Sequence, residues 1–207
     1  FAAPFIHIFL ALASRYFGYR FRDLEAFRRK VWKALDGHDG PVIWAANHLT
    51  LWDSFVIFWA VFPFLRTLEG RRLPWNTPEH TNYYRNGGWF KCRVIRVFMY
   101  LCRCIPFLRG GEDEFSVQWR QIAFEKCVWV LSEGGTVFVF PEATRARNGW
   151  FEADKPKDFL GRMALDATNA MFLCGYLRGN RQLYTAPIPD KGERFRVIGD
   201  LVAAVLP

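Results

Sequence analysis

The chain has 207 residues, enough for one domain whose hydrophobic core needs no disulfides or metal ions to hold it together. Hydrophobic residues make up 51% of the chain and aromatic residues 18%. This is more large apolar surface than such a core requires, so part of it is expected to meet an apolar partner. The formal net charge of +8 excludes an acidic surface and favours anionic lipid or nucleic acid as the partner, because both respond to the same positive field.

The cysteines are odd in number and form no Cys-x-x-Cys pair. This pattern argues against a disulfide framework and against a zinc site. We expect buried thiols in a reducing compartment. The five residues are Cys92, Cys102, Cys104, Cys127 and Cys174.

An apolar run over residues 1–17 opens the chain, and a stretch rich in Arg and Lys follows over residues 20–33. The run as far as Ala13 is shorter than the roughly 18 to 20 residues that span a bilayer. We therefore expect residues 1–33 to form a helical segment that associates with the membrane surface. The alternative is a core helix packed on the rest of the domain.

Strand and helix patterns then alternate. Residues 41–46 (PVIWAA) form a short continuous apolar run, typical of a strand buried on both faces. Residues 54–65 are apolar over too short a distance to cross a membrane, which indicates a buried helix. Residues 71–88 are rich in prolines, asparagines and glycines and are predicted to be an irregular loop or lid.

Further patterns of the same kinds follow. Residues 90–107 mix basic and bulky apolar side chains at helical spacing, which fits a membrane-facing helix or a solvated one. A helical pattern over 115–131 ends before a glycine pair, and residues 136–140 and 195–202 are predicted strands. The alternation predicts an α/β fold: a single layered domain with a mixed, largely parallel central sheet flanked by helices. Such folds place their chemistry where strands end.

The segment NHLTLWD follows the first predicted strand and places His48 and Asp53 five positions apart. Over one helical turn these side chains can meet. An aspartate that accepts a hydrogen bond from one ring nitrogen fixes the tautomer and leaves the other nitrogen as a base, as in Ser-His-Asp triads but without a protein nucleophile. The nucleophile would then be a hydroxyl of the substrate. By itself, the spacing also fits a structural histidine at a helix start.

Two arginine-bearing turns are the other candidate parts of a site. FPEATR follows a predicted strand and carries Glu142, Thr144 and Arg145. Arginine binds phosphate with two parallel donors, while Glu and Thr can bind hydroxyl groups. IPFLRGG offers Arg109 beside a glycine pair whose amides can face an anion. Together with the His/Asp pair, these turns predict a substrate that carries both a phosphate and a hydroxyl.

NHLTLWD and FPEATR resemble the NHx4D and FPEGTR blocks of the lysophosphatidic acid acyltransferase (PlsC-like) family, in the same order and with a similar separation. IPFLR is similar to the family's intermediate block, which ends in an arginine. The resemblance covers roughly residues 41–161. It implies transfer of a fatty acyl group from acyl-CoA or acyl-carrier protein to a lysophospholipid, most directly 1-acylglycerol-3-phosphate, in phospholipid synthesis.

The resemblance also implies roles for individual residues. His48 would be the general base on the acceptor hydroxyl, and Asp53 would orient it. Arg109 would bind the substrate phosphate. Acceptor-positioning roles fall on Glu142 and Arg145, and Asn47 and Thr144 complete the expected substrate-binding set. Asn47 is also expected to hold the turn. No metal ion or prosthetic group is implied, and backbone amides near the start of the helix after His48 are expected to stabilise the oxyanion.

Three departures from the family pattern concern the acceptor pocket. Ala143 stands where the family has glycine, which adds a methyl group where the backbone needs a positive φ or a close approach to substrate. Arg103 stands about where a glycine opens the intermediate block. After Gly161 the family's proline-containing terminal block has its nearest counterpart at residues 186–189.

Other functions are compatible with parts of the sequence. The protein could be a catalytically silent lipid-binding relative, although the intact His48 and Asp53 argue against this. A hydrolase would use the same base on water. The charge and the aromatic content also fit a nucleic-acid-binding protein, but the aromatic residues lie in apolar runs. Another lyso-lipid, such as an ornithine lipid, could be the acceptor.

The expected organisation is a membrane-association segment over residues 1–33 and an acyltransferase domain over residues 34–207. The expected partners are an anionic membrane surface, the acyl donor and the lysophospholipid, and no nucleic acid. The location would be the cytoplasmic face of a membrane, as a peripheral or monotopic protein.

Overall fold

A six-stranded sheet in the order β1-β6-β5-β2-β4-β3 forms the centre of the fold. The computed structural model describes residues 2–81, 89–145, 158–179 and 188–205. Strands β2, β3, β4 and β5 are parallel, β6 is antiparallel to β5, and β1 is parallel to β6. The strands are β1 (Arg20–Phe21), β2 (Val42–Ala46), β3 (Pro74–Asn76), β4 (Thr136–Val139), β5 (Met171–Gly179) and β6 (Arg194–Val205).

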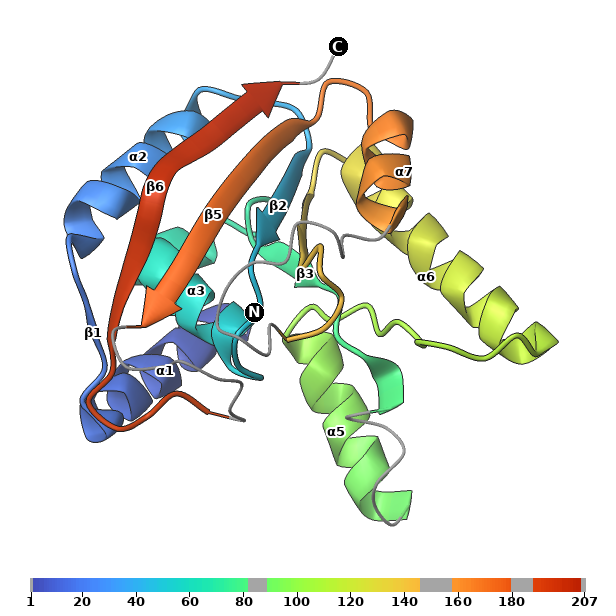
Figure 1. Cartoon of the computed structure of the whole chain (residues 1–207), viewed down its shortest axis with the longest axis horizontal. Coiled ribbons are helices and arrows are strands. Elements are labelled where there is room, and N and C mark those ends of the chain that lie inside the picture. Colours follow the sequence, from blue (N-terminus) through green and yellow to red (C-terminus); the bar gives the residue numbers. More distant parts are fainter. Residues whose placement is uncertain (1, 82–88, 146–157, 180–187, 206–207) are drawn as a thin grey trace.

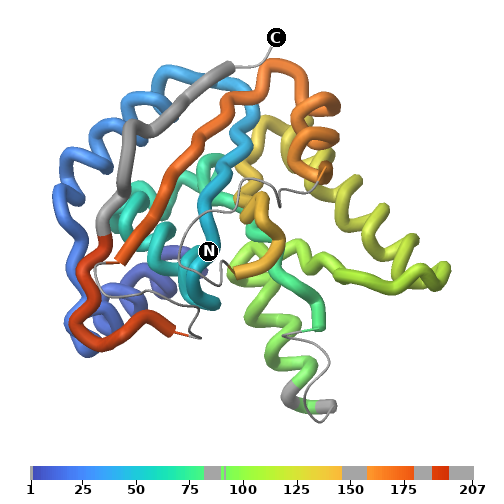
Figure 2. Tube along the Cα trace, in the orientation of Figure 1, coloured from blue at the N-terminus to red at the C-terminus, as the bar shows by residue number. Residues whose placement is uncertain are grey.

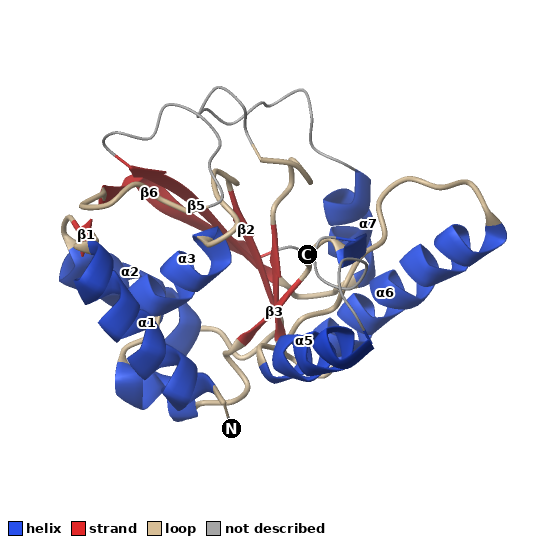
Figure 3. Ribbon diagram, turned by 90° about the horizontal axis from the view of Figure 1, so that it is seen from below, coloured by secondary structure: helices blue, strands red, loops and turns tan. Residues whose placement is uncertain are grey.

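Helices cover both faces of this sheet. Helices α1, α2 and α3 lie on one side, and α6 and α7 on the other (Figures 1 and 3). The expected α/β fold with a mixed, largely parallel sheet is confirmed. The helices are α1 (Ala3–Phe17), α2 (Leu24–Asp36), α3 (Asp53–Val61), the 3-10 helix η1 (Phe64–Leu68), α5 (Trp89–Leu101), α6 (Glu114–Ser132) and α7 (Asp158–Asp166).

Strand β2 is buried along its whole length, as its continuous apolar sequence predicts. Because side chains alternate across a strand, Trp44 joins the core cluster under α2 and α3, while Ile43 and Ala45 join the cluster under α6 and α7. Strand β4 repeats the pattern, with Phe138 in the first cluster and Val137 in the second. The two clusters hold the centre of the sheet, which carries the site, between two layers of helices.

Helix α3 is apolar on all sides because it lies between the sheet and the helices α1 and α2. It ends before Pro63, which disfavours helical geometry in the residue preceding it. Side chains of α2 donate hydrogen bonds to the carbonyl groups in the last turn of α3. Arg28 donates to Trp59 O and Ala60 O at 3.1 and 2.8 Å, and Trp32 Nε1 donates to Val61 O at 2.8 Å.

The N-terminal segment contributes to both the sheet and the core. Strand β1 pairs with the beginning of β6, so residues 20–21 lie beside residues 194–195, near the other end of the chain (Figure 2). Val31, Trp32 and Leu35 of α2 belong to the main core cluster. The expected boundary between residues 33 and 34 falls inside α2, so residues 20–36 are built into the same layers as the rest of the domain.

The prediction of an irregular loop over residues 71–88 is wrong at residues 74–76, which form the edge strand β3 beside β4. A proline is tolerated there because Pro74 is the first residue of an edge strand and needs no ladder donor. Residues 82–88 of the predicted loop lie outside the described residues. Residues 171–179, for which no element was predicted, form β5.

Large apolar side chains are exposed on α1, η1 and α5. No helix in the described part of the chain is both long and apolar enough to cross a membrane. The exposed residues, called below the α1–η1–α5 surface, are Phe5, Ile8, Phe9, Leu12 and Tyr16 of α1, Phe64, Leu65 and Leu68 of η1, and Phe90, Val94, Val97, Phe98, Tyr100 and Leu101 of α5.

The hydrogen bonds from Arg28 to the end of α3 are expected to stabilise the fold. Arg28→Met keeps an apolar stem but removes the donors to Trp59 O and Ala60 O. Because these hydrogen bonds link a guanidinium to the negative end of a helix dipole, we expect a loss of about 2 kcal/mol in the free energy of unfolding. Urea denaturation followed by circular dichroism measures it. Arg29→Met, on the exposed side of the same helix, is the matched control and should change stability by less than about 0.5 kcal/mol.

Candidate active site

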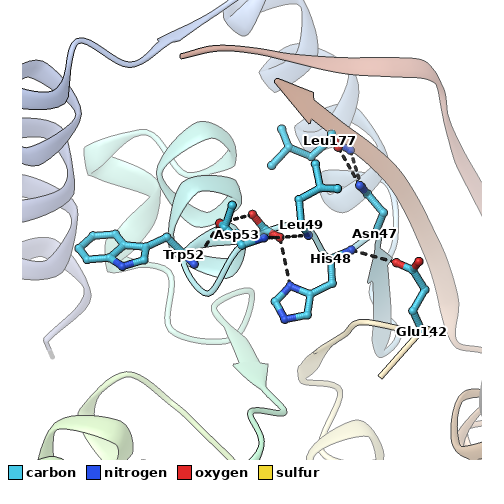
Figure 4. Close-up of polar contacts among 8 residues, drawn as sticks. Asn47, His48, Leu49, Trp52, Asp53, Glu142 and Leu177 are labelled. Carbon is cyan, nitrogen blue, oxygen red and sulfur yellow. Dashed lines mark hydrogen bonds and ion pairs between the residues drawn. The ribbon is translucent and has the colours of Figure 1, made fainter. Parts of the chain in front are cut away.

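The site lies where β2 and β4 end side by side. These strands are parallel neighbours, with Ala45 opposite Val139, so the segments that follow them emerge at the same edge of the sheet. A hydrogen bond joins the two segments: His48 N donates to Glu142 Oε2 at 3.1 Å (Figure 4). The two blocks that the sequence places 94 positions apart are therefore in direct contact.

Asp53 begins α3 and is buried, with 2% of its surface exposed. One carboxylate oxygen accepts from His48 Nδ1 at 3.1 Å, from Thr50 N at 2.7 Å and from Leu49 N. The second oxygen accepts from Thr50 Oγ1 at 2.6 Å. All four partners are donors, and the positive end of the α3 dipole adds to their effect. Asp53 is thus fixed as a hydrogen-bond acceptor for the imidazole.

His48 meets Asp53 as the five-residue spacing predicts. Because Asp53 serves only as an acceptor, Nδ1 is the nitrogen that carries the proton in the neutral ring. Nε2 is then left with its lone pair, and the side chain keeps 13% of its surface exposed. This arrangement is that of a general base oriented by a carboxylate.

The amides that follow the first predicted strand are already occupied. Three amides that precede α3 have side-chain partners and are not available to an oxyanion. His48 N points to Glu142, and Leu49 N and Thr50 N point to Asp53. These carboxylates need the amides because both side chains are buried. The expectation that amides near the start of the helix stabilise the oxyanion stays a prediction.

Asn47 joins β2 to β5 rather than facing open space. Its side-chain nitrogen donates to Leu177 O at 2.8 Å, and its side-chain oxygen accepts from Leu177 N at 2.7 Å (Figure 4). The residue is buried, with 2% exposed. Both ends of the amide are thereby used to hold the turn before His48, which is a positioning role.

The turn after β4 carries the remaining members of the second block. Glu142 is buried and Thr144 is exposed. Thr144 Oγ1 makes one long hydrogen bond, 3.4 Å, to Glu142 O. Arg145 is partly buried in the same turn. Glu142 therefore links the two blocks, while Thr144 and Arg145 lie toward the outside of the turn.

Ala143 has a φ of +55°. This is the left-handed region, which costs an L-residue roughly 1 kcal/mol or more and costs glycine nothing. The family's glycine at this position is thus explained by the backbone: the turn requires a positive φ between Glu142 and Thr144. Arg103, the other residue at an expected glycine position, also has a positive φ, +53°.

Arg109 lies on a segment that continues the edge of the sheet. Asn76, the last residue of β3, and Glu79 beyond it pair with Cys104 and Phe107 through two isolated bridges. Arg109 Nε forms an ion pair with the buried Glu79 Oε2 at 2.8 Å, and Arg109 N donates to Glu79 Oε1 at 3.3 Å. Burial lowers the pKa of the Arg109 guanidinium, and the negative charge of Glu79 opposes this shift. The Arg109 side chain keeps 43% of its surface exposed.

Three residues of the site region were missed by reasoning from sequence. Glu79 is the partner of Arg109, and Phe140 stacks on the ring of His48. Thr50 holds Asp53 and also accepts from Trp52 N at 3.2 Å. The spacing Thr50-x-x-Asp53 resembles a capping box at a helix start, so a signal for Thr50 was present in the sequence. Glu79 and Phe140 become visible only in three dimensions.

A cavity of about 190 Å³ lies beside α3, on the side of α1, η1 and the end of α5. Ser54, the residue after Asp53, is part of its lining, together with Phe55 and Phe58 of the same helix. Most of the other lining residues are apolar. They include Ile6, Leu68, Leu73 and Leu101.

Comparison with known proteins identifies a family and a similar fold. A family model described as Acyltransferase matches residues 19–188. No curated protein matches the chain. The fold is similar to that of the crystal structure of the 1-acyl-sn-glycerophosphate (LPA) acyltransferase PlsC from Thermotoga maritima, with a TM-score of 0.56 and 17% sequence identity, over 95% of this chain and 67% of that one.

Asn47 allows a structural role to be separated from substrate binding. Asn47→Ala leaves both backbone groups of Leu177 without their buried partners, so we expect the free energy of unfolding to fall by about 2 to 4 kcal/mol. Chemical denaturation measures this loss. Thr144→Ala, which removes only a long bond at an exposed position, should cost less than about 0.5 kcal/mol. An Asn47→Ala protein of unchanged stability with a raised KM for the acceptor would assign this side chain to substrate instead.

Proposed function

The chain belongs to the acyltransferase family, and on that basis we propose that it transfers a fatty acyl group from acyl-CoA or acyl-carrier protein to the hydroxyl of a lysophospholipid. We propose 1-acylglycerol-3-phosphate as the acceptor, in phospholipid synthesis. The observation that carries the proposal is the contact between His48 Nδ1 and Asp53 at the edge of the sheet, which leaves Nε2 as a base.

The chemistry follows from that base. His48 Nε2 takes the proton of the acceptor hydroxyl as its oxygen attacks the thioester carbonyl carbon. The tetrahedral intermediate then collapses, the carbon–sulfur bond breaks, and the imidazolium returns the proton to the leaving thiolate. The carboxylate of Asp53 stabilises the imidazolium between the two steps. No metal ion or prosthetic group takes part in this scheme.

The phosphate of the acceptor is proposed to bind to two arginine side chains, Arg109 and Arg145. The Nε of Arg109 is held by Glu79, and this ion pair orients the rest of the exposed guanidinium fork for an anion. Thr144, exposed on the same turn as Arg145, is suited to a hydroxyl or phosphate oxygen of the acceptor. Glu142 would act by holding the segment of His48.

The cavity beside α3 suits the fatty acyl chain. Its lining is largely apolar, and Ser54 and Phe55 connect it to the turn that carries Asp53. A long hydrocarbon chain gains about 0.8 kcal/mol for each buried methylene group, so burial here would hold the donor close to His48.

The α1–η1–α5 surface is proposed to dock on an anionic membrane, at its cytoplasmic face. Exposed aromatic and aliphatic residues suit insertion among lipid chains, and Arg93 and Arg96 lie exposed on α5 among them. The net charge of +8 adds long-range attraction to anionic headgroups. The cavity is lined by the first residues of α1, by Leu68 of η1 and by the end of α5, so a lipid substrate would reach it from this surface.

Replacing the base tests the proposed reaction. His48→Ala should reduce acyl transfer at least about 100-fold, because a general base contributes on that scale. The assay supplies labelled acyl-CoA or acyl-carrier protein with a panel of lyso-lipids, including 1-acylglycerol-3-phosphate and a lyso-ornithine lipid. His38→Ala is the matched control, since His38 precedes β2, at the opposite end of this strand from His48, and its imidazole bonds to the Pro41 carbonyl. It should retain activity within about twofold.

The same assay decides among the alternatives. Thioester cleavage at full rate without any acceptor would indicate a hydrolase. A His48→Ala protein as fast as the parent would exclude the mechanism. A parent inactive with every donor and acceptor of the panel would favour a silent lipid-binding relative.

Membrane docking is tested by vesicle flotation. The double variant Phe9→Ser and Leu12→Ser removes two exposed apolar side chains of α1, and we expect its binding to anionic vesicles to weaken at least about tenfold. Leu165→Ser is the control, because Leu165 is 84% exposed on α7, on the other side of the sheet. Equal loss of flotation in both proteins, or a parent that does not bind, would argue against this surface.

A further inference from the structure

The ring of Phe140 lies flat against the ring of His48. The two centroids are 4.0 Å apart and the planes differ by 14°. Phe140 is itself held edge-on by Phe138 at 4.9 Å and 89°, and Phe138 packs edge-on against Trp44 in the buried strand β2 at 5.9 Å. A row of aromatic rings therefore runs from the core of the sheet to the proposed base.

This stacking restricts the imidazole in a way that the hydrogen bond to Asp53 does not. A single hydrogen bond at Nδ1 lets the ring rotate about the line between the two atoms. A flat aromatic surface against one face removes this rotation, so the direction of Nε2 is set by two contacts. Phe140 also covers that face of the imidazole, which leaves the edge bearing Nε2 for substrate.

The stack also distinguishes the two protonation states of His48. A neutral imidazole gains only packing from a benzene ring, whereas an imidazolium is attracted to the negative face of the ring. In the proposed reaction, the positive charge develops only as the hydroxyl proton is transferred. Stabilisation that appears with this charge lowers the barrier instead of strengthening substrate binding.

We propose that Phe140 is a positioning residue, which directs Nε2 of His48 and stabilises the imidazolium formed when the acceptor hydroxyl is deprotonated. The inference rests on the proposed role of His48 as the base. Two carboxylates contact His48, those of Asp53 and Glu142, and Arg145 follows Glu142 in the turn after β4. All three are unchanged in the variants below.

Phe140→Leu and Phe140→Tyr separate the aromatic face from simple packing. We expect Phe140→Leu to reduce kcat about tenfold, the scale of a partly desolvated cation–π contact, with KM values for donor and acceptor within about twofold. The acidic limb of the pH profile of kcat/KM should move to lower pH by about 0.5 to 1 unit, because the protonated ring has lost its stabilising partner. Phe140→Tyr keeps the face and should stay within about threefold of the parent, with an unmoved acidic limb.

Proton NMR of the histidine rings gives a readout that does not depend on activity. The chain has four histidines, and comparison with His48→Gln assigns the signals of His48. In the parent, the face-on ring of Phe140 should shift the carbon-bound protons of His48 upfield. The shift should persist in Phe140→Tyr and disappear in Phe140→Leu.

Each outcome decides the question. A Phe140→Leu protein with the parental acidic limb, or with parental histidine shifts, would overturn the inference, even if kcat or stability fell. If Phe140→Leu does not fold, the parent spectrum decides, since a parent without an upfield His48 signal lacks the stack. Failure of the proposed function is a different result: His48→Ala would then keep its activity.

Discussion

The carboxylate of Asp53 is the contact on which the geometry of the site depends. It stands at the start of α3 and accepts from Leu49 N, Thr50 N, Thr50 Oγ1 and His48 Nδ1. The same carboxylate therefore holds the turn between β2 and α3 and fixes the tautomer of the imidazole. Such a buried carboxylate is tolerable only because each of its oxygens is satisfied by donors, so the turn cannot relax without exposing an unpaired charge.

The sheet supplies the rest of the arrangement. Because β2 is flanked by β4 and β5, its end is tied on both sides: Glu142 holds the backbone of His48, and Asn47 holds the backbone of Leu177. Phe140 closes the remaining side with its ring. The hydrogen bonds and the stack come from segments far apart in sequence, and their common origin is the parallel pairing of strands whose ends meet at one edge.

Sequence patterns located several of the longer elements, but β5 and α7 were not predicted. Continuous apolar runs and helical spacing located β2, β4 and α6, since burial on one or two faces leaves a direct record in the residue order. The predicted helices at 54–65 and 90–107 were too long, because α3 ends at Val61 and α5 at Leu101. Strand β3 was missed because it is short, begins with proline and gains its stability from β4 rather than from its own composition. Ala143 and Arg103 were recognised only as unusual residues at glycine positions, and the structure supplied the reason, a positive φ at both.

Local spacing and composition were enough to identify the chemical groups. These are an imidazole and a carboxylate one helical turn apart, a turn with acidic and basic residues after a later strand, and an excess of apolar and basic residues suited to a lipid surface. The partner of each group depends on contacts between segments far apart in the chain, which appear only in the folded protein. There the amides of residues 48–50 donate to carboxylates, Asn47 bonds to β5, Arg109 pairs with Glu79 and Phe140 lies on His48. These partners depend on the order of the strands in the sheet and on the need of buried polar groups for hydrogen bonds. Neither can be read from the residues next to each group in the sequence.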